Sequence, residues 1–306
     1  MKLQAKKALL AGVFGSLALQ GCDLSTIDSS DGATGTMTLN LSDAPLDDAK
    51  NIWVQISGVE LKHSDGRKQN IIFTSPAELD VLTLQGTNFT PLFKNYEIPT
   101  GTYKEIRLIV DQGAGTKTSI VFNDGTDYPL TIPSGSESGL KLKGNFSVSK
   151  NQNSTFLIDF DLRKSILKNG ADSYIMKPVL RAFSMGSVGV IKGEVANEFV
   201  RAASCSDGKS YSYNSVYLFE GAAATVSDIS GAAGDPIETA LVKRNDDSGD
   251  FEYNFGYLPA GDYTVAFTCR SDQDDVTQAG EDLDFAVLNN ITVVKDQTKT
   301  VNFTAE

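Results

Sequence analysis

Hydrophobic and polar residues alternate along most of the chain. In the first such run, Met37, Leu39 and Leu41 are separated by Thr38 and Asn40. Because successive side chains of a strand point to opposite faces, this period of two is typical of a half-buried β-strand. Turn residues such as Asp-Gly pairs separate the runs and predict antiparallel pairing. Six more runs precede residue 185, at 52–57, 106–110, 119–122, 140–148, 156–160 and 179–183.

The alternation lapses at 184–187, and seven short runs then follow between Val188 and the C-terminus. No long segment has the period of a helix, and the short helical candidates are 76–84 and 162–168. The pattern predicts an all-β protein with two antiparallel β-sandwich-like domains, residues 36–185 and 188–306. At most one or two short helices are expected, in the first domain.

One hairpin can be assigned a register from the sequence alone. A three-residue loop at 150–152 would place Phe146 opposite Phe156 on an almost wholly apolar face. The other face would then pair two lysines with two aspartates. The hairpin therefore predicts structural cross-strand ion pairs, Lys141 with Asp161 and Lys143 with Asp159.

The first residues of the chain have a different pattern. Three lysines precede an apolar run, 8–19, which is too short for a permanent transmembrane helix. The following Leu19-Gln20-Gly21-Cys22 resembles the bacterial lipobox. That resemblance implies that residues 1–21 are a lipoprotein signal peptide, that Cys22 is lipidated, and that 22–35 is a flexible tether. An ordinary signal peptide with a chance cysteine is the alternative.

The lipobox resemblance implies a bacterial cell envelope protein whose membrane contact is its lipid anchor. Asp23 follows the cysteine, and in enteric bacteria an aspartate there resembles an inner-membrane retention signal. Other bacteria need not read it, so we expect the outer membrane rather than the inner one. The protein would face the periplasm or the cell surface.

The net charge of the chain limits the kinds of molecule that it can bind. Loss of residues 1–21 removes three lysines and no acidic residue, which moves the formal net charge from −12 to −15. A chain with this much negative charge lacks the basic surface that binds the phosphates of nucleic acid. We expect a protein or glycan ligand instead.

The chain has three cysteines, and lipidation of Cys22 would leave Cys205 and Cys269. In an oxidising compartment an even pair favours a disulfide. Two unrelated buried thiols are the alternative.

Separated motifs in the first domain carry a family resemblance. These are Ser42-Asp43-Ala44-Pro45, Ile98-Pro99-Thr100-Gly101-Thr102-Tyr103, Ile132-Pro133-Ser134-Gly135, Asp159-Phe160-Asp161 and Lys177-Pro178. Their order and spacing resemble the bacterial lipoprotein family named domain of unknown function 4382, over residues 34–183. The resemblance implies an extracytoplasmic β domain and supplies no catalytic residues.

The second domain is similar to carboxypeptidase-regulatory-like and collagen-adhesin B-type repeats. The residues that carry this likeness are Gly193-Glu194-Val195, 246–251 and 257–265. It implies a transthyretin-like sandwich and says little about chemistry.

Candidate chemistry is sparse. His63 is the only histidine, and its Ser-Asp-Gly sequence context predicts an exposed hairpin turn rather than a catalytic base. Asp159 and Asp161 share a strand face about 7 Å apart, a spacing that glycosidase carboxylates use. The lysines predicted opposite them favour structural ion pairs instead.

Two further features are candidate binding surfaces. Trp53 would face outward from its strand, where it could stack on a sugar or contact a protein. We expect instead that residues 89–93 cover it. Six acidic residues crowd one C-terminal segment and make calcium a possible ligand, although their spacing fits no known calcium loop: Asp272, Asp274, Asp275, Glu281, Asp282 and Asp284.

The sequence therefore favours a lipid-anchored, non-catalytic binding, adhesion or structural module without a cofactor. The alternative is a carbohydrate-binding or carboxylate-based glycan-processing envelope protein.

Overall fold

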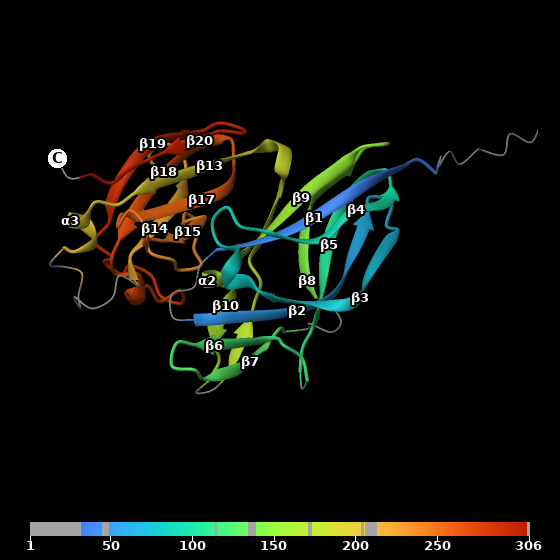
Figure 1. The fold of residues 1–306 in the computed structure, drawn as a ribbon, viewed down its shortest axis with the longest axis horizontal. Helices are drawn as coiled ribbons and strands as arrows, with labels where there is room; N and C mark the ends of the chain where they lie inside the picture. Colours follow the sequence, from blue (N-terminus) through green and yellow to red (C-terminus); the bar gives the residue numbers. More distant parts are fainter. Residues whose placement is uncertain are drawn as a thin grey trace, which may run out of the picture. The chain divides into compact units, whose positions relative to one another are not determined.

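Four β-sheets dominate the fold, two in each half of the sequence (Figure 1). The computed structural model describes residues 32–44, 49–113, 115–133, 139–170, 173–202, 205 and 213–304. The predicted signal peptide and the lipidation site Cys22 lie outside the described residues, as does most of the tether. From Ala33 onward the chain forms one compact unit. In the part of the chain that the structure describes, no helix has the length and hydropathy of a membrane span.

The N-terminal domain contains the strands up to β12. One sheet has the order β12 (Leu180–Ser184), β9 (Asn153–Asp161), β1 (Thr34–Ala44) and β4 (Thr90–Pro99). The other has the order β10 (Ile166–Lys168), β11 (Tyr174–Met176), β7 (Asp127–Thr131), β6 (Ser119–Phe122), β2 (Ala49–His63), β5 (Gly101–Asp111) and β8 (Leu140–Val148). β3 (Lys68–Asp80) also pairs with β2. Three single turns interrupt the strands: η1 (Val81–Leu84), α2 (Leu162–Ser165) and η2 (Met185–Ser187).

The C-terminal domain contains the remaining strands. One of its sheets has the order β16 (Lys243–Arg244), β17 (Phe251–Pro259), β13 (Val188–Glu194) and β20 (Thr298–Thr300). The other has the order β15 (Glu238–Leu241), β14 (Ser215–Glu220), β18 (Gly261–Thr268) and β19 (Ala286–Val293). Two single turns also occur here, α3 (Asn197–Val200) and η4 (Ser271–Gln273). The prediction of a mostly β protein with two β domains and only short helices is confirmed.

Alternation identified the core correctly. Met37, Leu39 and Leu41 of β1 are fully buried, and so are Ile52 and Val54 of β2. These side chains belong to one hydrophobic cluster, which fills the N-terminal domain. The period of two therefore determined which face of each strand packs inward.

The predicted hairpin is wrong. β8 pairs with β5, whereas β9 lies in the other sheet, parallel to β1 and antiparallel to β12. Phe146 and Phe156 still touch, with ring centroids 5.5 Å apart, because both are buried in the shared core. The apolar faces of β8 and β9 thus meet without backbone pairing between these strands.

Helical segments were overestimated and some strands were missed. Pro76 to Asp80 ends β3, so that only Val81–Leu84 of the predicted 76–84 helix is helical, as a 3-10 turn. Helix α2 likewise ends at Ser165, and Ile166–Lys168 is strand β10. Strands β3, β4 and β7 gave no clear alternating pattern.

The structure confirms the predicted disulfide between Cys205 and Cys269. It joins the segment after α3 to the residue that follows β18. The two cysteines are 64 residues apart in sequence. In the chain-entropy model, a loop of this length stabilises the folded state by about 4 kcal/mol.

We predict that replacing both Cys205 and Cys269 by serine lowers the free energy of unfolding by up to about 4 kcal/mol, because the unfolded chain regains the entropy of the open loop. Urea unfolding of wild type and variant measures the difference. Adding reductant should destabilise the wild type and leave the double variant unchanged. Equal sensitivity of both proteins would contradict the structural role of this bond.

Candidate functional site

Buried charged residues gather where the N-terminal and C-terminal domains meet. We call six of them the junction cluster: Asp159 and Asp161 of β9, Arg163 and Lys164 of α2, Arg181 of β12, and Glu238 of β15. Four of the six are at most 6% exposed (Asp159, Asp161, Arg163 and Glu238). Charges so far from water need partners, so their contacts decide what the cluster can do.

Arg181 lies at the centre of the junction cluster. It is the cross-strand partner of Asp159, and its Nη2 lies 2.5 Å from Oδ2 of that residue. The same nitrogen lies 2.8 Å from Oε2 of Glu238, in the other domain. Ser42 of β1 donates a hydrogen bond of 2.9 Å to the second oxygen of Asp159. One guanidinium group therefore joins two carboxylates from different domains.

Helix α2 makes the other polar contacts across the junction. Asp161 caps the helix by accepting from the backbone N–H of Lys164, and the Nζ atom of Lys164 lies 3.3 Å from its carboxylate. That Nζ also donates to the carbonyl oxygen of Pro236 in the C-terminal domain. The Asp161 cap stabilises the first turn of α2, and the Lys164 side chain links this helix to the C-terminal domain.

A third contact involves an aromatic hydroxyl. Arg163 donates to the hydroxyl oxygen of Tyr217, 2.7 Å away, and this hydroxyl donates to Asp274 over 2.5 Å. Tyr217 lies on β14 and is fully buried. These two hydrogen bonds link Arg163 of the N-terminal domain to Tyr217 and Asp274 of the C-terminal domain.

Burial shapes the electrostatics of the cluster. It raises the pKa of Glu238 to about 8, because Arg181 offsets only part of the desolvation and Asp159 adds a second negative charge nearby. Burial alone would lower the pKa of Arg181, but the two carboxylates hold that pKa above its ordinary value. Burial also raises the pKa of Asp274. The carboxyl group of Glu238 therefore keeps its proton to a higher pH than an exposed glutamate does.

The predicted pairs of Lys141 with Asp161 and Lys143 with Asp159 are wrong. Both lysines are exposed on β8, where they face Arg107 and Glu105 of β5. The aspartates lie on β9 in the other sheet, where Arg181 and Lys164 neutralise them instead. Both aspartates do have cationic partners, but the strand order places Arg181 and Lys164 beside them rather than the two lysines of β8.

His63 does not lie in an exposed turn. Its side chain is 14% exposed, and Nδ1 lies 2.9 Å from the carboxylate of Asp65. The ring packs edge-on against Tyr103, with centroids 5.2 Å apart. Its Nε2 is buried close to Gly101, where a Cβ would collide with it. The side chain is therefore shielded by its own domain.

Trp53 and the acidic segment also have clear surroundings. Trp53 is half-buried, and the ammonium group of Lys117 lies 4.9 Å from its ring centroid, a cation–π contact. Phe89, of the segment predicted to cover it, packs on Tyr257. Among the described residues no group of acidic, histidine or cysteine side chains has the arrangement of a metal site, so the structure offers no calcium geometry for the segment around Asp275.

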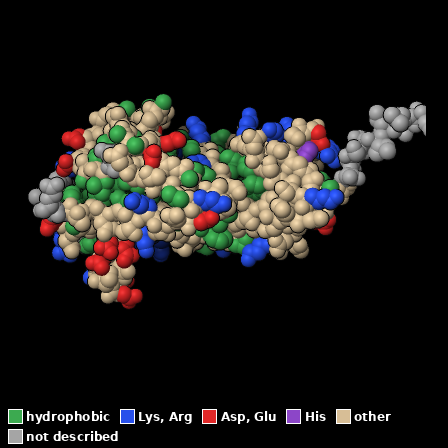
Figure 2. Space-filling view, turned by 90° about the horizontal axis from the view of Figure 1, so that it is seen from above, with side chains coloured by type: hydrophobic (Ala, Val, Ile, Leu, Met, Phe, Trp, Pro, Cys, Tyr) green, Lys and Arg blue, Asp and Glu red, His purple; other side chains and the backbone are tan. Residues whose placement is uncertain are grey.

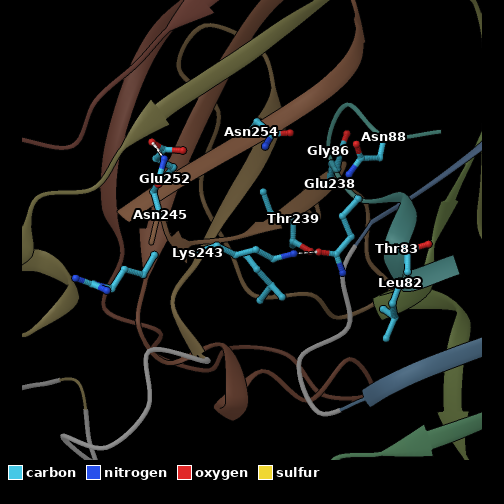
Figure 3. Close-up of a pocket in the computed structure, with 14 residues that line it drawn as sticks. Leu82, Thr83, Gly86, Asn88, Glu238, Thr239, Lys243, Asn245, Glu252 and Asn254 are labelled. Carbon is cyan, nitrogen blue, oxygen red and sulfur yellow. Dashed lines mark hydrogen bonds between the residues drawn. The ribbon is translucent and has the colours of Figure 1, made fainter. Parts of the chain in front are cut away.

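A cavity of about 350 Å³ opens beside the junction cluster (Figure 3). One wall is the segment 82–88, which contains η1 and the turn before β4, and the other is formed by residues of β15, β16 and β17. Gly86 allows the walls to approach, because a Cβ there would lie 1.8 Å from Oδ1 of Asn254. Its φ of +68° is also a conformation that favours glycine.

Most groups that line the cavity are carboxamides, hydroxyls and charges. Lys243 donates to the side chain of Gln85 over 2.7 Å, and Asn245 donates to Glu252 over 2.9 Å, as drawn in Figure 3. Burial lowers the pKa of Lys243. Sequence reasoning missed this site because its walls are about 150 residues apart and carry no motif.

One face of the molecule carries side chains of both charges (Figure 2). On the face shown in Figure 2, Lys and Arg side chains are scattered, whereas Asp and Glu side chains gather most densely on one protruding part. On this face the cations are therefore separated from one another rather than gathered in one basic patch (Figure 2).

Comparison with known families identifies the N-terminal domain. The family model described as "Domain of unknown function (DUF4382)" matches residues 34–178. This segment is therefore a DUF4382 domain, and it contains all the strands up to β11. No curated protein matches the chain.

Solved structures show distant likeness only. A leucine-rich repeat protein of Bacteroides thetaiotaomicron is 12% identical with a TM-score of 0.19, over 88% of this chain and 26% of that one. The minor pilin of Streptococcus agalactiae is 12% identical with a TM-score of 0.17, over 87% and 94%. The fimbrial anchor protein of Porphyromonas gingivalis is 11% identical with a TM-score of 0.17, over 81% and 83%.

We predict that Arg181→Met destabilises the protein by roughly 3–5 kcal/mol, because the buried carboxylate of Asp159 loses its cation and Glu238 loses its hydrogen-bond donor. Urea unfolding measures the loss. The matched control is Arg67→Met, which removes an exposed partner of Asp65 and should leave the unfolding midpoint nearly unchanged. Equal effects of the two substitutions would show that Arg181 does not hold the domains together.

The raised pKa of Glu238 predicts a pH dependence of stability. Below its ordinary value of 4.5 the carboxyl is protonated in both folded and unfolded states. Between pH 4.5 and about 8 only the folded state keeps the proton, so this group's contribution to stability falls as pH rises and is lost above about 8. Glu238→Gln should remove this part of the slope in unfolding experiments from pH 4.5 to 8.5. Identical slopes for variant and wild type would contradict the assignment.

Proposed function

We propose that the chain is a non-catalytic envelope lipoprotein whose two β domains act together as a binding, adhesion or structural module. The observation that carries this proposal is the junction cluster. Carboxylates that could serve in acid–base chemistry are buried there and joined to cations of their own chain.

The geometry of the aspartates disfavours a glycosidase. Such an enzyme needs one carboxyl group that gives up a proton to the substrate and a second that attacks or activates water. Both oxygens of Asp159 are bonded, to Arg181 and Ser42, and Asp161 caps α2. A sugar would have to displace these buried bonds before either group could act.

The contacts across the junction support a module that works as one piece. Arg181, Lys164 and Arg163 each reach a partner in the C-terminal domain. Independent motion of the domains would expose and break three charged contacts, which is costly at buried positions. The two domains can therefore present a fixed surface at a fixed distance from the anchor.

The anchor and the location belong to the same proposal. Cys22 would carry the lipid, and the polar segment 22–35 would separate the β domains from the bilayer. With a net charge of −15, the mature chain has little attraction for anionic lipid, so the acyl chains would be its membrane contact. An outer-membrane position, with a protein or glycan partner, fits these properties.

We predict that Cys22→Ser abolishes incorporation of a palmitate analogue and moves the protein from the membrane fraction to the soluble fraction, because the anchor is lost. Fractionation of cells that express each form measures this. Ser29→Ala, in the tether, serves as the control and should behave as wild type. Membrane retention of the Cys22 variant would remove the lipid anchor from the proposal.

Absence of catalysis can be tested directly. Purified protein should release no reducing ends from envelope glycans. Turnover that disappears in a folded Asp159→Asn variant would overturn the non-catalytic assignment in favour of glycan processing.

A further inference from the structure

The cavity between segment 82–88 and strands β15 to β17 has the properties of a ligand site. Its volume of about 350 Å³ lies within the range of small-molecule pockets, about 300–1,000 Å³. Residues from both domains line it, and the junction cluster fixes those domains against each other. A cavity with fixed walls costs a ligand little reorganisation.

Two carboxamides in this cavity have unused bonding capacity. Asn88 and Asn254 line it, and within the described part of the chain neither side chain has a hydrogen bond to the protein. Asn88 belongs to the N-terminal domain and Asn254 to β17 of the C-terminal domain. Each side chain offers two donor hydrogens and an acceptor oxygen. The Oε1 of Gln85 accepts from Lys243, and its Nε2 has no hydrogen-bond partner among the described residues.

Thr239 adds a buried polar group beside the same cavity. Its residue lines the wall, is 3% exposed, and has a hydroxyl oxygen without a hydrogen-bond partner. Buried hydroxyls without partners are unusual and costly. A ligand hydroxyl group that reached this oxygen would supply the missing partner.

The charges around the cavity favour a ligand without net charge. Glu238 is held by Arg181, Glu252 accepts from Asn245, and burial lowers the pKa of Lys243. Positive and negative side chains are therefore both present, and neither sign dominates. Leu82 and Leu241 supply short apolar stretches of wall, which suit the C–H groups of a ring.

We propose that this cavity binds a neutral saccharide, whose hydroxyl groups bond to the carboxamides of Asn88 and Asn254. Neutral saccharides combine many hydroxyls with small apolar patches, which is the complement of the wall described above. The proposal rests on the binding function inferred for the module and names its ligand class and site.

A printed array of neutral and sialylated oligosaccharides tests the proposal with the full-length chain in mild detergent. We expect selective binding of neutral glycans. Titration calorimetry with the best oligosaccharide should then show a Kd about tenfold weaker for Asn88→Ala and for Asn254→Ala, since each loses one or two hydrogen bonds. Asn70→Ala, an exposed asparagine on β3, is the matched control and should bind as wild type.

The asparagines of the cavity are exposed enough that the variants should fold, and thermal unfolding verifies it. No glycan binding, or binding that both folded variants keep, would overturn the saccharide site. That result would leave the proposed module in place, because anchoring and lack of turnover are measured separately. Hydrolysis of the bound glycan would instead overturn the non-catalytic function.

Discussion

The structure depends on one arginine whose guanidinium group binds two buried carboxyl groups. Arg181 holds Asp159 within its own sheet and Glu238 across the domain junction. A buried ion pair gains little free energy over an apolar contact, but an unpaired buried charge is strongly unfavourable. The arrangement therefore favours one relative position of the two domains over all others.

The junction cluster and the neighbouring cavity follow from the same geometry. Glu238 belongs to both, since it binds Arg181 and also lines the cavity. Movement at the ion pair would alter the spacing between Asn88 and Asn254, which lie on different domains. Stability and recognition are thus linked at a single residue.

Local patterns in the sequence predicted more of the core than of the strand order. Alternation located the buried residues of β1 and β2, because the inward face depends only on each strand's own pattern. The predicted hairpin was wrong because the contact between Phe146 and Phe156 does not depend on backbone pairing. The two rings bury the same apolar surface whether their strands pair or lie in opposite sheets. Pairing depends on distant strands, here β5 for one and β1 for the other.

Parts of the site were visible in the sequence and parts were not. The motifs Ser42-Asp43 and Asp159-Phe160-Asp161 were recognised separately, and the structure brings them together through the parallel pairing of β1 and β9. Their partner Glu238 has no motif, and neither have Gln85, Asn88 and Asn254 of the cavity. Such groups acquire a role only when the fold places remote segments side by side.

The single tryptophan has a consequence for experiments on cooperativity. Trp53 lies in β2, so its fluorescence reports on the N-terminal domain alone, while the Cys205–Cys269 bond belongs to the C-terminal domain. The N-terminal domain can therefore be followed by tryptophan fluorescence, and the C-terminal domain can be perturbed separately by reduction of its disulfide. If Arg181 couples them into one cooperative unit, reduction of a bond in one domain will shift the emission midpoint of an indole in the other.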